Sequence, residues 1–443
     1  MVNILGVDID NKLNLENFSS KVKGFFISNE QHYITTPNPE IILKAQEDEE
    51  LFYILNKSSL AIADGFGLKL AGLLSGKWVR RLTGVTALLE ILKIAEEKEK
   101  KVLIVNNKNG LSSSEEIESA LSKKYPKLNF LIENCSFDFS VNAKKELISF
   151  DFLKDNIFTK IAKKIEKKIN DKLEFLVPDK LLDYSPDVLI CNFGAPYQEK
   201  FIFHNLGKLP TVKAAIGIGG ALDFLTGKIK RAPKILRYLG LEWLWRLVKQ
   251  PQRYKRIFRA IFVFPIKFFQ WRFINPLFYR RNVICLLYRK KEIPYTALEN
   301  KKRSPLEHYQ VLLVERSEEA GHWQLPQGGI ESNTIKRAGS RELYEELGIE
   351  SFLPKKIYRN LFKYKTNHQG RYGFKGQKQS LLIAEYKGSD ADIKLNFWDH
   401  SAWKWIKATD LVDEVYPLRK EGAKIFLKKL ENYIETNLNK KYE

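Results

Sequence analysis

Three glutamates between positions 342 and 346 have the types and the spacing needed to act on a diphosphate. They stand in the segment RELYEELGI, which begins at Arg341. If this segment is helical, Glu342, Glu345 and Glu346 lie three and four residues apart on one face. Three carboxylates so placed can bind Mg²⁺ through oxygen and polarise a diphosphate for attack by water. An acidic, solvated helix face is the competing interpretation.

Four further clusters combine glycine, proline and polar residues where apolar strands are expected to end. They are TTPNPEI at 35–41, ADGFGL at 63–68, GAPYQEKFI at 194–202 and GIGGALDFLTGKIKRAP at 217–233. Open α/β sheets bind their ligands at the ends of strands. Asp64, exposed by the flanking Gly65 after an apolar strand, could serve there as a general base. Asp-Gly is also a common pair in plain turns.

A strongly basic and aromatic stretch lies between residues 228 and 281. It holds fifteen Lys or Arg side chains and one acid, Glu242, and so carries +14 of the formal net charge of +21. Cations mixed with amphipathic rings suit an anionic interface, such as lipid headgroups or a polyphosphate. Nucleic acid is a competing partner, and a pair of core helices with solvated arginine stems is a third interpretation.

The apolar run at 257–278 is the part of this stretch that favours a membrane over nucleic acid. Its bulky apolar side chains are unsuited to a groove binder. Charged residues and a proline interrupt the run too often for a segment that crosses a bilayer. We therefore expect it to lie in the membrane interface.

The elements that must position these residues follow two patterns. In the first half of the chain, short β-rich runs alternate with helical stretches, which predicts an α/β, Rossmann-like layered domain with a mostly parallel sheet. The runs are HYITT, LAIADG, KVLIV, PDVLICNFG and VKAAIGIGG. Beyond about residue 279, the runs NVICLLY, YQVLLVE and SLLIAEY with two helices predict a second, α+β domain. Residues 159–173 are predicted as an amphipathic surface helix, and 289–305 as an exposed loop.

Length and composition agree with two domains inside a cell. With 443 residues and 44% hydrophobic content, each domain can bury a core. Cys135, Cys191 and Cys285 stand far apart without paired metal spacing, which favours a reducing compartment and no structural zinc. The N-terminus shows no long apolar stretch typical of a signal peptide. We therefore predict a cytoplasmic protein, peripheral on the inner face of the plasma membrane.

The four clusters, followed by GLEWLWRLVKQPQRYKR at 240–256, resemble the WecG/TagA/CpsF glycosyltransferases over roughly residues 1–260. The resemblance implies transfer of an N-acetylhexosamine, typically N-acetylmannosamine, from UDP to an undecaprenyl-diphosphate-linked sugar. Such a reaction belongs to cell-surface polysaccharide or teichoic acid synthesis. The resemblance points to Asp64 as the base that deprotonates the acceptor hydroxyl. Thr36, Asn38 and Arg81 are placed with it in the catalytic set, although the prolines around Asn38 leave a plain turn as the alternative.

Further side chains are expected to bind the donor. Gln198 and Glu199 look like donor-binding groups, with a solvated helix start as the alternative. Because UDP leaves with negative charge, the site needs a metal or fixed cations. The candidate cations are Arg231, Arg246, Arg253 and Arg256. The last three match the family's C-terminal arginines in spacing. This implies a transferase that requires no cofactor, while Asp8 and Asp10 leave a metal-dependent one as the alternative.

The segment WQLPQGGIESNTIKRAGSRELYEELGI resembles the Nudix box, within a region at about 279–435 that looks most like RNA pyrophosphohydrolases and diadenosine tetraphosphate hydrolases. The resemblance implies that Arg341 and Glu345 are catalytic and that Glu342, Glu345 and Glu346 bind Mg²⁺. The first half of the box is imperfect. Gly328 stands one position too close to Arg341, and Asn333 or Thr334 stands where a glutamate belongs.

These observations predict a bifunctional enzyme. We expect a transferase domain at 1–256, an interfacial membrane-contact segment at 257–278 and a Nudix domain at 279–443. The expected partners are a UDP-sugar donor, a polyprenyl-diphosphate-linked acceptor, an anionic membrane surface, and a nucleotide or 5′-phosphorylated RNA for the Nudix domain. The alternative is a nucleotide- or RNA-directed Nudix pyrophosphohydrolase whose N-terminal domain only tethers it to membrane or RNA. A homo-oligomer is left open.

Overall fold

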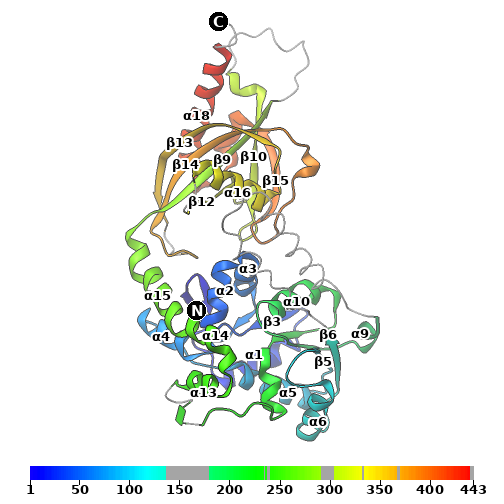
Figure 1. Ribbon diagram of the computed structural model, residues 1–443. Helices are drawn as coiled ribbons and strands as arrows, with labels where there is room; N and C mark the ends of the chain where they lie inside the picture. Colours follow the sequence, from blue (N-terminus) through cyan, green and yellow to red (C-terminus); the bar gives the residue numbers. More distant parts are fainter. Residues whose placement is uncertain are drawn as a thin grey trace. The chain divides into compact units, whose positions relative to one another are not determined.

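A computed structural model describes the chain in several ranges. They are residues 1–135, 179–233, 235–236, 240–290, 304–331, 334–366 and 370–439. The chain divides into two compact units, Met1–Gln270 (unit 1) and Trp271–Glu443 (unit 2). In Figure 1, unit 1 is coloured from blue to green and unit 2 from green to red. The helix predicted at 159–173 and most of the loop predicted at 289–305 lie outside the described residues.

Unit 1 contains a sheet of six parallel strands in the order β4-β3-β8-β7-β5-β6. The strands are β3 (His32–Thr35), β4 (Leu60–Ala61), β5 (Val102–Asn107), β6 (Phe130–Cys135), β7 (Val188–Asn192) and β8 (Ala214–Gly217). Because all of them are parallel, their carboxyl ends share one edge of the sheet. The predicted Rossmann-like α/β fold is confirmed.

Helices cover both faces of this sheet. They are α1 (Leu15–Phe25), α2 (Pro39–Glu47), α3 (Glu49–Lys57), α4 (Phe66–Leu74), α5 (Gly84–Glu97), α6 (Ser114–Lys124), α9 (Asp179–Tyr184), α10 (Tyr197–Asn205) and α11 (Leu222–Leu225). One core gathers apolar side chains of α1, α5 and α6, and another gathers those of α3 and α10. A hairpin of β1 (Val2–Ile4) and β2 (Val7–Ile9) leads to Asp10, which bridges to Ile62 just after β4.

The basic stretch folds into short consecutive helices. They are α13 (Glu242–Lys249), α14 (Tyr254–Phe258), a π-helical turn (Arg259–Val263), α15 (Phe264–Phe269) and a second π-helical turn (Gln270–Ile274). α15 packs against α2 and α4 (Figure 1). Among the described residues, no helix is both long and apolar enough to span a bilayer.

The aromatic rings of α14 and α15 lie on two different faces. Phe264 and Phe268 are buried, each with 2% of the residue exposed. Burial of one such ring contributes about 1.5–3 kcal/mol. Phe258, Phe262 and Phe269 are more than half exposed. One face is therefore part of the core, as the core-helix interpretation expects, and the other forms an apolar surface.

Unit 2 is built on a mixed sheet with the order β11-β10-β9-β14-β13, in which β12 pairs with β9 and β15 with β10. β9 and β14 are parallel, and the other pairs are antiparallel. The strands are β9 (Arg280–Lys290), β10 (Tyr309–Arg316), β11 (Trp323–Gln324), β12 (Gln327–Gly329), β13 (Phe352–Lys365), β14 (Gly376–Tyr386) and β15 (His400–Lys407). α16 (Ile335–Leu347) packs with one apolar cluster, and α17 (Leu411–Glu414) and α18 (Lys420–Asn439) pack with another.

The sequence patterns did not predict β6, β13 or β15. β13 has 14 residues, which makes it long for a strand, yet its sequence FLPKKIYRNLFKYK does not alternate strictly and contains Pro354. It lies at the end of the strand order, and its pairing with β14 shifts register twice. Proline, lysine and bulges are typical of edge strands. These features explain why β13 resembles a loop in the sequence.

Candidate active sites

Asp64 lies just beyond the carboxyl end of β4, beside the loop that follows β3. Its backbone N–H donates to the carbonyl of Pro37 (2.9 Å), and the N–H of Gly84 donates to its Oδ2 (3.3 Å). The carboxylate therefore meets the first residue of α5, where backbone donors favour negative charge. Gly65 follows with φ of +127°, a conformation that requires glycine and turns the chain sharply into α4.

Thr36 and Asn38 lie in the loop between β3 and α2. Thr36 is buried, and its hydroxyl donates to the carbonyl of Gly217 at the end of β8 (3.4 Å). Asn38 is the N-cap of α2, where its Oδ1 accepts from the N–H of Ile41 (3.0 Å). The structure thus brings Thr36 and Asp64 together beside Gly84. The place of Asn38 in the catalytic set stays a prediction.

Gln198 and Glu199 are buried at the start of α10, not on a solvated helix start. Gln198 Oε1 accepts from the N–H groups of Gly194 (3.0 Å) and Gly219 (2.8 Å), and its Nε2 donates to Glu199 Oε1 (2.9 Å). Burial raises the pKa of Glu199. Gln198 therefore joins the loops that follow β7 and β8. Direct contact of these two side chains with a donor stays a prediction.

The predicted arginines fall into separate places in unit 1. Arg81 pairs with Glu242 of α13 (2.7 Å), and Arg231 Nη2 donates to the hydroxyl of Thr83 (3.4 Å). Arg81 stands three positions before Gly84, and Arg231 contacts the residue just before Gly84, so both lie near the start of α5.

The other three arginines belong to the helices of the basic stretch. Arg256 Nε donates to both oxygens of Glu40 on α2 (2.8 and 2.9 Å). Arg253 is close enough to Asp223 for its charge to oppose the rise that burial causes in the pKa of that carboxyl. The side chain of Arg246 lies outside the described part of the chain.

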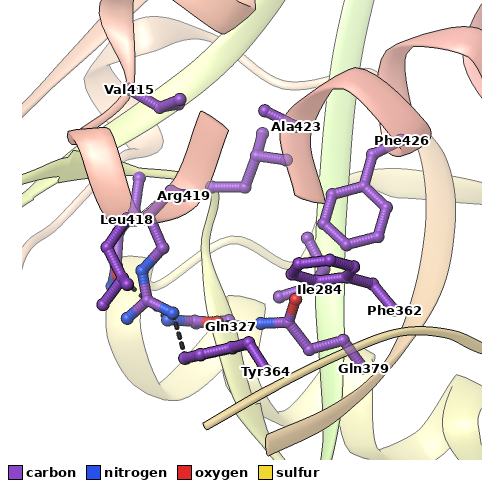
Figure 2. A pocket seen from close by; sticks show the side chains of 12 residues that line it. Ile284, Gln327, Phe362, Tyr364, Gln379, Val415, Leu418, Arg419, Ala423 and Phe426 are labelled. Atoms are coloured by element: carbon purple, nitrogen blue, oxygen red, sulfur yellow. Dashed lines mark hydrogen bonds between the residues drawn. The ribbon is translucent and has the colours of Figure 1, made fainter. Parts of the chain in front are cut away.

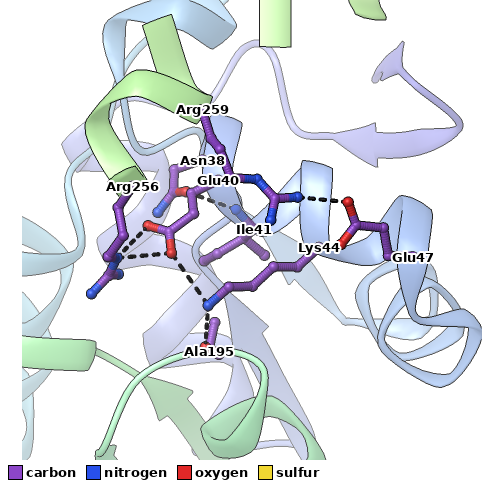
Figure 3. A network of polar contacts seen from close by, with 8 residues as sticks. All are labelled: Asn38, Glu40, Ile41, Lys44, Glu47, Ala195, Arg256 and Arg259. Atoms are coloured by element: carbon purple, nitrogen blue, oxygen red, sulfur yellow. Dashed lines mark hydrogen bonds and ion pairs between the residues drawn. The ribbon is translucent and has the colours of Figure 1, made fainter. Parts of the chain in front are cut away.

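Sequence reasoning missed the acids that receive these arginines. Figure 3 shows Glu40 between Arg256 and Lys44, and Glu47 paired with Arg259. One of these ion pairs left a trace in the sequence. Glu242 is the single acid of the basic stretch, and it pairs with Arg81. The acidic partners of Arg256 and Arg259 lie more than 200 positions away in the sequence, where no spacing rule reaches.

In unit 2, α16 carries the acidic residues predicted from the Nudix-like segment. Thr334 is the N-cap of α16, where its hydroxyl accepts from the N–H of Arg337 (3.3 Å), and Asn333 lies outside the described residues. Arg341 donates to Glu345 Oε2 (2.8 Å), to Glu342 Oε1 (2.5 Å) and to the carbonyl of Gly329 (2.9 Å). A Cβ on Gly328 would lie 1.7 Å from the Glu342 carboxyl carbon, so any side chain there would displace this carboxylate.

The carboxylates of α16 suit a hard cation by their chemistry, because Mg²⁺ prefers oxygen ligands. Arg341 holds two of them in this arrangement, and Glu346 lies 3.3 Å from His400 Nε2. Within the described ranges, no three His, Cys, Asp or Glu side chains are gathered closely enough to hold a metal. The oxygen atoms of these carboxylates fit Mg²⁺. To bind the ion, Glu345 would have to give up its bond to Arg341.

A pocket lies on the face of the unit 2 sheet that α18 covers. Its side chains include Gln324, Gln327, Gln379, Phe362, Phe426, Tyr364 and Arg419. Figure 2 shows the rings of Phe362 and Phe426 close together, and Arg419 donating to the Tyr364 hydroxyl. Gln327 donates to Gln324 (2.9 Å) and accepts from Gln379 (3.2 Å). The open space among these side chains is about 20 Å³, room for roughly one water molecule, so the rings and amides pack mainly against one another.

Comparisons with known proteins assign a family to each part of the chain. The model of the glycosyl transferase WecG/TagA/CpsF family matches residues 2–276, and the model of the NUDIX domain matches residues 298–429. An N-acetylglucosaminyldiphosphoundecaprenol N-acetyl-beta-D-mannosaminyltransferase of Bacillus subtilis is 29% identical over 253 residues, which are 55% of this chain and 85% of that protein. The Staphylococcus aureus protein of the same name is 29% identical over 60% of this chain and 91% of its own length.

Among solved structures, the C. elegans Ap4A hydrolase binary complex is similar to 34% of this chain and 98% of its own, with 21% identity and a TM-score of 0.25. The family match over residues 2–276 covers the Thr36, Asp64, Gln198 and arginine positions described above. The chain therefore belongs to the WecG/TagA/CpsF family of glycosyl transferases and carries a NUDIX domain in its C-terminal part.

Proposed function

We propose that unit 1 transfers an N-acetylhexosamine, with N-acetylmannosamine as the preferred sugar, from UDP to an undecaprenyl-diphosphate-linked sugar. The observation that supports this most is the meeting of Asp64, Thr36 and the start of α5 at the edge where the parallel strands end. The relatives from B. subtilis and S. aureus are named for this transfer. The product would serve cell-surface polysaccharide or teichoic acid synthesis.

In the proposed reaction, Asp64 takes the proton of the acceptor hydroxyl. The acceptor oxygen then attacks the anomeric carbon, the bond from that carbon to UDP breaks, and the configuration inverts. UDP leaves with added negative charge, which fixed cations can stabilise without a metal. Arg81 and Arg231, beside the start of α5, and Arg256 with Arg253 and Arg246 in the basic stretch are the candidates.

A UDP-release assay tests this proposal. The full chain is given a panel of UDP-N-acetylhexosamines and a synthetic prenyl-diphosphate-linked sugar, with and without EDTA. We expect release that depends on the acceptor, is fastest with UDP-N-acetylmannosamine and persists in EDTA. Absence of acceptor-dependent release with every donor would refute the transferase assignment, and loss in EDTA would refute the metal-free mechanism.

For unit 2 we propose Mg²⁺-dependent hydrolysis of a nucleoside diphosphate-linked substrate. Glu342, Glu345 and Glu346 would hold the ion, which would polarise the diphosphate for attack by water. Arg341, which also donates to the Gly329 carbonyl, would keep Glu342 oriented. Diadenosine polyphosphates and 5′-phosphorylated RNA are the substrates to compare.

We also propose that the chain meets the inner face of the plasma membrane as a peripheral protein. The transferase would occupy 1–256, the membrane segment 257–278 and the Nudix domain 279–443. From α14 to α15, Phe258, Phe262, Ile266 and Phe269 are exposed at helical spacing, and Lys and Arg residues alternate with them in the sequence. Rings among cations suit a layer of anionic headgroups.

The double variant Phe262→Ser, Phe269→Ser is expected to lose flotation with phosphatidylglycerol-containing vesicles. Each buried ring contributes on the order of 1.5–3 kcal/mol, so affinity should fall by roughly 10²-fold or more. The double variant Phe397→Ser, Leu353→Ser removes exposed apolar side chains of unit 2 and should float like the parent. Unchanged flotation of the Phe262→Ser, Phe269→Ser variant would contradict the membrane proposal. So would a gel shift of RNA by the parent that this variant no longer gives.

A further inference from the structure

Glu40 connects the basic stretch to helix α2. Arg256 Nε lies 2.8 and 2.9 Å from the two Glu40 oxygens. The Glu40 side chain is 15% exposed, whereas that of Arg256 is 56% exposed. A carboxylate so deeply covered needs a charged partner. Figure 3 shows Glu40 extending from α2 and Arg256 extending toward it from α14.

The same carboxylate also pairs with Lys44, which contacts the loop at 194–198. Lys44, one helical turn after Glu40, places Nζ 3.2 Å from Glu40 Oε1 and donates to the carbonyl of Ala195 (2.7 Å) (Figure 3). Ala195 precedes α10, next to Gly194, whose N–H donates to Gln198. Lys44 also lies close enough to Glu199 to oppose the rise that burial causes in the pKa of that carboxyl.

These contacts form one continuous series. It runs from Arg256 through Glu40 and Lys44 to Ala195, and from Gly194 through Gln198 to Gly219. Burial alone would raise the pKa of Glu40, but the charge of Lys44 and the bond from Arg256 hold that pKa below its ordinary value. The carboxylate therefore remains charged and can hold both cations at neutral pH.

We propose that Glu40 is a positioning residue on which both the docking of the basic stretch and the shape of the loop at 194–198 depend. This inference rests on the proposed transferase function of unit 1. When Arg256 is docked, Glu40 keeps Lys44 on the Ala195 carbonyl and so fixes the loop that Gln198 joins to Gly219. Loss of the Glu40 charge loosens the stretch and the loop together.

The neighbouring pair on α2 provides a matched comparison. Arg259 bonds Glu47 at 2.7 Å, so it also ties the basic stretch to α2. Glu47 is more exposed than Glu40, with 48% of its side chain accessible, and exposed pairs contribute little. Glu47→Gln therefore removes a similar ion pair without touching the Lys44 contact.

The test uses the full chain and compares Glu40→Gln with Glu47→Gln by amide hydrogen exchange. For Glu40→Gln we expect roughly tenfold faster exchange both in 254–263 and at Gly194 and Gly219, since a charge-assisted bond is lost at each end. Glu47→Gln should change neither region by more than about twofold. With active enzyme, the KM for the UDP-sugar should rise roughly tenfold in Glu40→Gln, with a smaller change in kcat.

Two further variants separate positioning from a general loss of stability. Lys44→Met should loosen the 194–198 loop and raise the KM while leaving 254–263 protected. The swap Glu40→Arg with Arg256→Glu should restore protection of 254–263 but not of the loop, because Lys44 then faces a cation. If Glu40→Gln behaves like Glu47→Gln, or loosens only one region, the inference is wrong. The exchange data decide this even if the parent transfers no sugar, which would refute the transferase assignment separately.

Discussion

Replacement of Asp64 by asparagine is expected to lower kcat/KM for sugar transfer by roughly 10²–10⁴-fold, the range of a lost general base. The amide has the shape of the carboxylate, and its oxygen can still accept from the N–H of Gly84. The turn at Gly65 and the strand before it are untouched. We therefore expect the variant to fold and to bind UDP like the parent, while acceptor-dependent UDP release almost disappears.

Asp10→Asn is the matched control for this prediction. Asp10 Oδ2 accepts from the N–H of Ala61 on β4, three positions before Asp64 (3.0 Å). This bond gives Asp10 a structural task, so transfer should stay within about threefold of the parent. A large loss of turnover in Asp10→Asn that Mg²⁺ relieves would instead favour the metal-dependent alternative. Full activity of Asp64→Asn would show that another group takes the proton.

The part of the site that the sequence predicts is the part that the backbone determines. Thr36, Asp64 and Gly217 each follow an apolar run, and parallel strands bring such positions to one edge. The ion pairs could not be predicted in this way. Arg81 and Glu242 are 161 positions apart, and Arg256 and Glu40 are 216 apart. Which acid receives an arginine depends on how helices pack, and local spacing does not contain that information.

Helix packing also determines features of the basic stretch that its sequence alone could not predict. Its composition indicates cations and rings, but the separation of the rings into two faces depends on where α15 meets α2 and α4. A Cβ on Gly67 of α4 would lie 3.7 Å from the Phe264 ring, an ordinary contact distance, so this ring packs directly against α4. Phe262 and Phe269, with equal hydropathy, stay exposed. Membrane contact can therefore be tested on Phe262 and Phe269 without disturbing the core.

The second large effect is expected in unit 2, where Glu346→Gln should abolish Mg²⁺-dependent hydrolysis. A bound Mg²⁺ stabilises the transition state by several kcal/mol, so loss of a ligand should lower the rate by roughly 10²–10⁴-fold. The substrates to measure are nucleoside diphosphate-linked compounds, diadenosine tetraphosphate and 5′-triphosphate RNA. Glu350→Gln removes an equal charge from an exposed position just after α16 and should keep the parent rate.

Glu345→Gln distinguishes a metal ligand from a partner of Arg341. As a ligand, Glu345 must leave Arg341 when Mg²⁺ binds, so its loss should raise the Mg²⁺ concentration needed for half-maximal rate. If Glu345 only anchors Arg341, the rate should fall at every Mg²⁺ concentration with the half-maximal value unchanged. Because Arg341 also bonds Glu342 and the Gly329 carbonyl, α16 should stay attached to the loop at Gly329 in either case. Failure of the parent to hydrolyse any of these substrates with Mg²⁺ would instead make unit 2 a nucleotide-binding module.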